Sequence, residues 1–242
     1  GNPDAELENN GKLIKRDSGY TVVSTRVANS GQLIVDGGVL SFGGYVANSG
    51  SLQVGSGATL QFAGSSSHSA TASLSNGAGT VVLSGGTHSF ADGFNDFGSG
   101  VTDLQSGVLE VNSGSAQLGR MNVAGTIQGS GNVIVANASI TGGIMTGSGS
   151  TILASGGSHS LSGAYQYLRS GRTLRNDGQL VVGSTTNDVK LYMDGSNGGT
   201  AKTRLVNQGE MVFQGARNTY IYQGSGNPDA ELENNGKLIK RD

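Results

Sequence analysis

Short runs in which apolar and polar side chains alternate dominate the chain. Residues 33–35 (LIV), 40–42 (LSF), 52–54 (LQV) and 60–62 (LQF) carry apolar side chains at every second position. A period of two is typical of a β-strand with one buried face and one face in water. Strands of this length are too short for a β-sandwich but fit the sides of a coil, so the pattern predicts an all-β chain of short strands and tight turns.

The turns share a unit that reads apolar-x-Asn-x-Gly-x-apolar. Asparagine and glycine accept a positive φ at low cost, which a sharp corner between two strands requires. We therefore predict that the Asn and Gly of each unit form a structural turn. The predicted turn residues are Asn9, Gly11, Asn29, Gly31, Asn48, Gly50, Asn176, Gly178, Asn207 and Gly209.

The chain also contains a long exact repeat, which we call the duplicated segment. Residues 1–17, GNPDAELENNGKLIKRD, return unchanged at 226–242, so residues 1–225 are one full period. Nine glycine-to-glycine intervals of unequal length fill this period. Repeats of this size indicate stacked supersecondary units. We predict a single-stranded parallel β-solenoid of about nine coils, in which residues 1–225 form one block and 226–242 begin the next.

This organisation predicts the partner as well as the fold. A solenoid end presents unpaired strands, and an identical block can stack upon them. We expect adjacent identical blocks to join end to end in a longer tandem array, of which this sequence is one period and an overlap. A viral fibre segment, which would trimerise, is an alternative.

Composition narrows the function classes. The chain has 43 Gly but only two Pro, as expected where nearly every backbone N–H joins a ladder. The net charge of −2 gives no drive toward nucleic acid, and no apolar run is long enough to insert into a membrane. The chain has no cysteine, so disulfides and thiolate chemistry are excluded. We expect no cofactor.

Several Gly-rich runs resemble a known class of proteins. The runs NSGxLxV, GSGATLQF, GAGTVVLSGGTHSF and GSGSTILASGGSHSL are similar to the passenger regions of autotransporters, to filamentous-haemagglutinin-like proteins and to giant repetitive bacterial adhesins. The resemblance implies a right-handed parallel β-helix at the bacterial cell surface or in an extracellular filament. It also implies a role in adhesion or cell-envelope structure. With the tandem organisation, we expect a stiff structural and adhesive scaffold, and we expect no enzymatic activity.

Three carboxylates raise the alternative of a glycan-cleaving or glycan-binding β-helix. Asp92, Asp96 and Asp103 lie close together in sequence, and glycoside hydrolases need paired carboxylates across a groove. A later stretch, which begins at Thr151 and aligns with the one that begins at Thr80, has Gly163, Tyr167 and Leu174 at the corresponding positions. A solvated loop is therefore expected rather than a catalytic site, and Asp92, Asp96 and Asp103 are candidates for contact with a glycan.

Aromatic and basic residues gather in the last third of the chain. Tyr165, Tyr167, Arg169 and Arg172 are candidates for contact with a host or environmental glycan, and packing of the tyrosines over the solenoid is the alternative.

Three histidines precede serine, at His68, His88 and His159. Imidazoles in consecutive coils can bind a metal ion, but the shared GG(T/S)HS context of His88 and His159 indicates a recurring turn residue three coils apart. We therefore predict no metal site.

Overall fold

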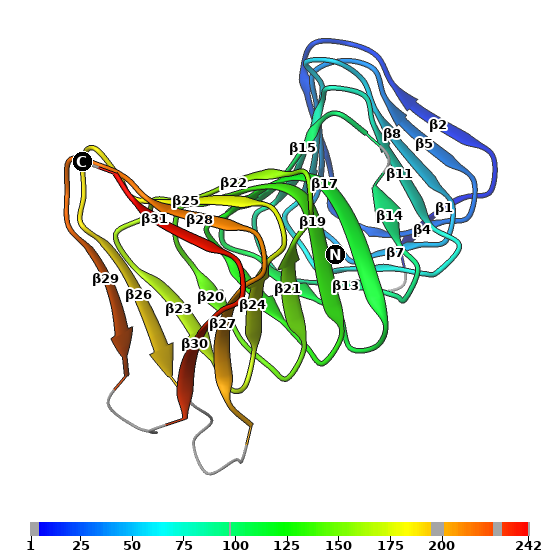
Figure 1. Cartoon of the computed structure of the whole chain (residues 1–242). Coiled ribbons are helices and arrows are strands. Elements are labelled where there is room, and N and C mark those ends of the chain that lie inside the picture. The colour runs from blue at the N-terminus through cyan, green and yellow to red at the C-terminus, as the bar shows by residue number, and fades with distance from the viewer. Residues whose placement is uncertain (1–4, 97, 195–200, 225–228, 242) are drawn as a thin grey trace. The chain divides into compact units, whose positions relative to one another are not determined.

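The computed structural model describes residues 5–96, 98–194, 201–224 and 229–241, and these residues form strands and turns without any helix. None of them belongs to a helix that could cross a membrane. The chain divides into two compact units, residues 1–120 and 121–242. The prediction of an all-β parallel β-solenoid is confirmed, because the described strands pair in parallel, turn upon turn (Figure 1).

The first strand of each turn lies on what we call side 1, an 11-stranded sheet. In unit 1 its strands are β1 (Glu6–Asn9), β4 (Arg26–Asn29), β7 (Val46–Asn48), β10 (Ser66–His68), β13 (Thr87–Phe90) and β16 (Val108–Glu110). In unit 2 they are β18 (Thr126–Gln128), β20 (Ile144–Met145), β23 (Gln166–Arg169), β26 (Val189–Asp194) and β29 (Thr219–Gln223).

The second and third strands of each turn, sides 2 and 3, belong to a 20-stranded sheet. Side 2 of unit 1 contains β2 (Lys12–Lys15), β5 (Gln32–Val35), β8 (Ser51–Val54), β11 (Ser73–Asn76) and β14 (Asn95–Asp96). Side 3 of unit 1 contains β3 (Tyr20–Val23), β6 (Val39–Phe42), β9 (Thr59–Phe62), β12 (Thr80–Leu83) and β15 (Val101–Leu104). The long strand β17 (Ser115–Val123) follows β16.

Unit 2 continues this order of strands. Its β19 (Asn132–Ile140) covers two sides, since Val133–Val135 pair with β21 (Ser150–Leu153) and Ser139–Ile140 pair with β22 (Ser158–Leu161). The remaining strands on side 2 are β24 (Thr173–Asn176), β27 (Thr203–Asn207) and β30 (Ala230–Asn234). Those on side 3 are β25 (Gln179–Val182), β28 (Glu210–Phe213) and β31 (Lys237–Lys240).

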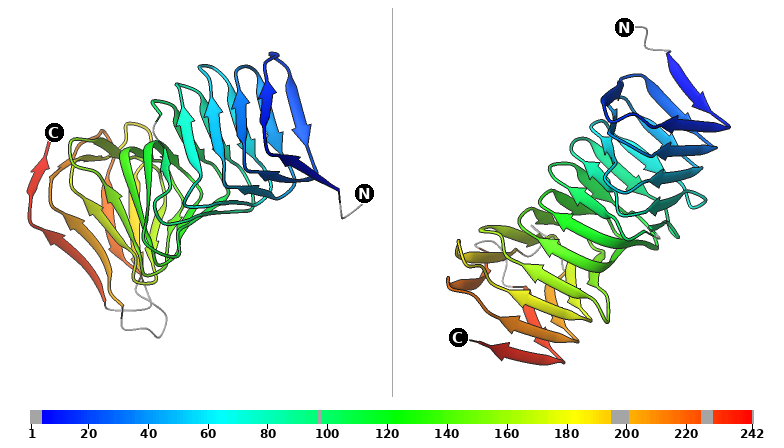
Figure 2. Two further views of the ribbon diagram at one scale, coloured as in Figure 1. Left: turned by 90° about the vertical axis from the view of Figure 1, so that its right-hand side faces the viewer. Right: turned by 90° about the horizontal axis from the view of Figure 1, so that it is seen from above.

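The strands of each unit stack turn by turn (Figure 2). Their inward-facing residues therefore form columns of like side chains, which make up the core. In unit 1, Leu33 pairs with Leu52, which pairs with Leu74. Phe42 likewise pairs with Phe62, and their ring centroids lie 5.9 Å apart. All five side chains are buried. The predicted alternation therefore places apolar residues inward, where removal from water stabilises the fold.

The number of residues in one turn of the solenoid varies along the chain, although the strands that form its sides stay similar in length. A short turn separates the in-register partners Thr126 and Ile144, whereas a much longer one separates Asn176 and Asn207. This variation agrees with the unequal glycine intervals in the sequence. Most strands nevertheless have about the same length, so the corners absorb the additional residues.

The two copies of the duplicated segment occupy different sides. ELEN forms β1 on side 1 at residues 6–9, whereas the same four residues at 231–234 belong to β30 on side 2. KLIK forms β2 on side 2 and β31 on side 3. Residues 1–4, 225–228 and 242, and with them part of the predicted block boundary, lie outside the described residues.

Candidate functional site

A groove of about 600 Å³ runs over side 1 of unit 1. One outward-facing column forms its floor, in which each residue is the in-register partner of the next. The column consists of Glu8, Ala28, Ala47, Ser67, Ser89 and Glu110. Four small side chains thus lie between two carboxylates, which are five strand spacings apart, or about 24 Å. The floor is extended along the stack of turns and combines small apolar and hydroxyl side chains with a carboxylate at each end.

A ladder of asparagines lies on the inward side of the same strands. Asn9 Nδ2 donates to Asn29 Oδ1 at 2.6 Å, and Asn29 Nδ2 donates to Asn48 Oδ1 at 2.6 Å. All three side chains are buried. Because a buried amide without a partner is costly, the ladder fixes the register of the strands that carry it.

The hydrogen-bonded ladder continues from Asn48 to His68, and Ser66 links His68 to His88. Asn48 Nδ2 lies 3.4 Å from His68 Nδ1, and Ser66 Oγ lies 2.9 Å from both His68 Nε2 and His88 Nδ1. An amide N–H can only donate, so His68 Nδ1 accepts and its proton is on Nε2. The Ser66 hydroxyl then donates to His88 Nδ1. Ser66 is buried and hydrogen-bonded on both sides, so it is no exposed nucleophile.

Burial keeps both histidines neutral. It lowers the pKa of His68 to about 3 and that of His88 to about 4. His68 is one turn from His88, through the pairing of Ser66 with His88, while His159 lies in unit 2 and its Nδ1 accepts from Ala138 N at 3.1 Å. No cluster of three metal-ligating side chains occurs within the described residues.

The turn residues have a role other than the predicted one. The glycines Gly31, Gly50 and Gly209 are absent from the positive-φ positions of the described chain, as are the asparagines that precede them. A Cβ on Gly50 would instead collide with the carbonyl oxygen of Gly31 in the turn before it. Glycine is thus required by the close approach of stacked corners, and asparagine by its side-chain ladder. The predicted φ was wrong at these positions.

The three aspartates do not converge on one site. Asp92 Oδ1 accepts from Ser115 N at 2.8 Å, and Asp103 Oδ2 accepts from Gln105 Nε2 at 2.8 Å. Asp96 is only 8% exposed and accepts from Gly98 N at 3.1 Å. Burial raises the pKa of Asp96 to about 6. Each carboxylate has a local structural partner, and Asp96 offers little surface to a ligand.

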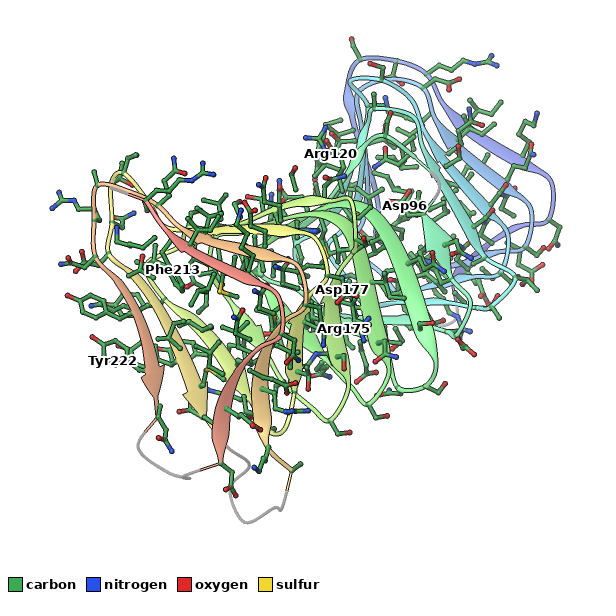
Figure 3. All side chains as sticks on the ribbon, viewed as in Figure 1. Asp96, Arg120, Arg175, Asp177, Phe213 and Tyr222 are labelled. Carbon is green, nitrogen blue, oxygen red and sulfur yellow. The ribbon has the colours of Figure 1, made fainter. Side chains whose placement is uncertain are left out.

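The tyrosines form a self-stacked ladder on the outer face of unit 2. The Tyr192 ring lies between Tyr167, at a centroid distance of 5.3 Å, and Tyr222, at 5.1 Å. Tyr165 also stacks on Tyr192, at 6.4 Å. Figure 3 shows Tyr222 on the strand beside β26. The rings thus pack against one another, as the packing alternative describes, while Tyr165 and Tyr222 are 53% and 37% exposed.

The two candidate arginines differ in burial. The Arg169 guanidinium covers the Tyr167 ring at 4.2 Å and pairs with Asp194 at 2.9 Å. Arg172 is 0% exposed, and donates to Thr151 Oγ1 at 3.1 Å and to the carbonyl oxygens of Gly129 and Ser150 at 3.1 and 2.9 Å. Burial lowers the pKa of Arg172 to about 10. Arg172 therefore has no atom to offer a surface ligand.

The sequence pattern did not predict two of these features. The groove arises because small outward residues coincide in register over successive turns. The His68–Ser66–His88 link requires two inward-facing histidines on neighbouring strands, two residues apart in register. No protein-family model, no curated protein and no solved structure matches the chain.

Proposed function

We propose that this chain is a structural repeat block of a secreted bacterial surface protein or extracellular filament, acting as a stiff scaffold without catalysis. The observation that carries the proposal is that polar and aromatic side chains interact mainly with side chains and carbonyl groups of the neighbouring turns of the solenoid. Asparagine, tyrosine and arginine side chains bond to the turn above or below rather than gathering around a vacant centre. Such ladders, with parallel backbone hydrogen bonds, resist bending and unwinding together.

The test is a protein in which two blocks share one copy of the duplicated segment at their junction. If the chain is a scaffold block, electron micrographs should show one continuous particle with about twice the length of a single block. Proteolysis should be as slow at the junction as within each block, because the backbone there would also be paired. Two particles joined by a protease-sensitive linker would contradict the proposal.

The groove on side 1 favours a second candidate function, binding of an extended glycan. Its floor places the Ser67 and Ser89 hydroxyl groups in one line with the carboxylates of Glu8 and Glu110. Ser67 Oγ accepts from the Tyr45 hydroxyl at 2.7 Å and Ser89 Oγ donates to Glu110 Oε2 at 3.0 Å, so a glycan would share these groups with their partners in the chain. A glycan array with the intact chain tests this function. Replacement of Ala47 by Tyr, which would fill the floor, should abolish a signal that depends on the groove, whereas Tyr165→Ala in unit 2 should leave it unchanged.

A further inference from the structure

The duplicated segment is observed with two different neighbours. At residues 6–15 it pairs with the turn that follows it, through β1 with β4 and β2 with β5. At residues 230–240 it pairs with the turn that precedes it, through β30 with β27 and β31 with β28. The structure thus contains the lower contacts and the upper contacts of one sequence, on separate copies.

We propose that the partner of the last turn is a second copy of this chain, joined so that one segment has both sets of contacts at once. This inference rests on the proposed function, and specifies its junction. The segment lies on sides 2 and 3 over β27 and β28, and β4 and β5 of the second copy then follow on those sides. Each block therefore begins one side further around the coil than the block before it.

The apolar column supports this junction. Leu232 pairs with Leu205 below it, and Leu7, the same residue of the repeat, pairs with Val27 above it. Leu232 is 46% exposed and Leu238 is 48% exposed, although both face along the core column. In the junction Leu232 gains the valine and Leu238 gains the equivalent of Leu33, so both become buried.

The asparagine ladder gives the junction its direction. Asn176 Nδ2 donates to Asn207 Oδ1 at 2.8 Å, and Asn207 Nδ2 donates to Asn234 Oδ1 at 2.7 Å. Asn9, the counterpart of Asn234, donates onward to Asn29. Each of these amides donates toward the C-terminal turn. In the junction one asparagine accepts from Asn207 and donates to Asn29, so the ladders of two blocks become one.

The outward charges are complementary at the same level. Arg204 pairs with Glu231 at 3.4 Å, and Arg26 pairs with Glu6, the same glutamate of the repeat, at 3.1 Å. The junction therefore places one carboxylate between two guanidinium groups. Exposed ion pairs contribute little free energy, but an alternation of charge along a column disfavours a shifted register.

The third side of the junction joins β29 to β3 of the second copy. Tyr20 and Val22 on β3 are 62% and 53% exposed, and Tyr222 on β29 is 37% exposed. Tyr222 is the end of the tyrosine ladder in the described residues. Because β3 follows β2 along the chain, it reaches side 1 and covers β29 only if the block is offset by one side.

Engineered disulfides can locate the segment, since the chain has no cysteine of its own. We would use the two-block protein at low concentration with three separate cysteine pairs. The lower pair is Arg204→Cys with Glu231→Cys, and the upper pair is Glu231→Cys with Arg26→Cys of the second block. The control pair is Glu231→Cys with Tyr220→Cys, which would meet only if the segment lay over β29. In-register strands are about 4.8 Å apart, within the range that a disulfide spans.

We expect the lower and upper pairs to oxidise and the control pair to stay reduced. Upper and control bridges without the lower one would overturn the offset, while the continuous particle of the scaffold proposal would remain. A lower bridge alone would show that the second block does not stack, which contradicts the scaffold proposal as well. Absence of all three bridges in a folded protein would also overturn the inference.

Hydrogen exchange provides a measurement without substitutions. Amides of residues 230–234 and 237–240 should exchange at least about tenfold more slowly in the two-block protein than in the single chain, because their strands become internal. Equal exchange rates in the two proteins would contradict the junction.

Discussion

Gly11 and Gly236 are the same residue of the duplicated segment, yet their surroundings are opposite. A Cβ on Gly236 would collide with the carbonyl oxygen of Gly209, whereas a Cβ on Gly11 would meet no heavy atom within 4 Å beyond its chain neighbours. The same glycine is therefore indispensable where a turn lies beneath it and replaceable where none does. The difference follows from the close approach of stacked corners.

This pair gives a matched test of the role of glycine. Gly236→Ala should detach β30 and β31 and speed the hydrogen exchange of residues 230–240, since the added methyl group has no space. Gly11→Ala should change the free energy of unfolding by less than about 0.5 kcal/mol, as surface substitutions usually do. Equal effects of the two substitutions would contradict the account.

The asparagine ladder predicts a large cost for a single substitution. Asn29→Ala removes an acceptor from Asn9 and a donor from Asn48. The Asn48 Oδ1 acceptor and one N–H of the Asn9 amide, which keeps its bond to Gln32 O, would each lose a partner. At about 1 to 3 kcal/mol each, the unfolding free energy should fall by roughly 2 to 6 kcal/mol. Urea denaturation measures the loss. Asn10→Ala, which removes only an exposed bond to Ser30, is the control and should have little effect.

Acid should destabilise unit 1 through its buried histidines. The pKa values of His68 and His88 are lowered to about 3 and about 4, so the unfolded chain binds more protons as the pH falls below about 6.5. Stability contributed by the neutral imidazoles is then lost progressively down to those values. Asp96, whose pKa is raised to about 6, acts in the opposite sense, because its protonated form is favoured in the fold.

The aspartate can be separated from the histidines by Asp96→Asn. The amide cannot ionise, so the variant should be more stable than the parent at pH 7 and should lose stability more steeply between pH 6 and pH 4. Urea denaturation at pH 7, 5.5 and 4.5 provides the comparison. An Asp96→Asn variant whose stability is unchanged over this range would rule out the assignment of the histidines, because no opposing carboxylate is then left at this position.

Arg172 should be a stronger determinant of stability than any exposed arginine. Arg172→Met removes the guanidinium donors from Thr151 Oγ1 and Ser150 O, while Gly129 O keeps its bond from Gly149 N at 3.1 Å. We expect a cost of about 1 to 3 kcal/mol for each buried group that loses its partner. Arg175→Ala is the control, because Arg175 forms a half-exposed ion pair with Asp177 at 2.7 Å, and its loss should cost below about 1 kcal/mol. Figure 3 labels both residues. Both variants can be compared by urea denaturation.

Local pattern was sufficient for much of the fold because a solenoid repeats its contacts. Leu33 and Leu52 pair because alternation turns both inward, and each turn places like beside like. The candidate site was harder to predict from the sequence. Arg172 and Tyr165 both look like surface residues in sequence, but one is 0% exposed and the other 53% exposed, since turns of unequal length decide which faces inward.

The sequence by itself determined the strand, turn and strand rhythm and the parallel stack, because these depend on alternation and on the recurrence of the Asn and Gly unit. Only the tertiary structure decided which side of the coil each strand occupies. ELEN lies on side 1 as β1 and on side 2 within β30 despite its identical residues. The side is set by the turns on which a strand stacks, and turns of unequal length accumulate along the chain before the segment recurs.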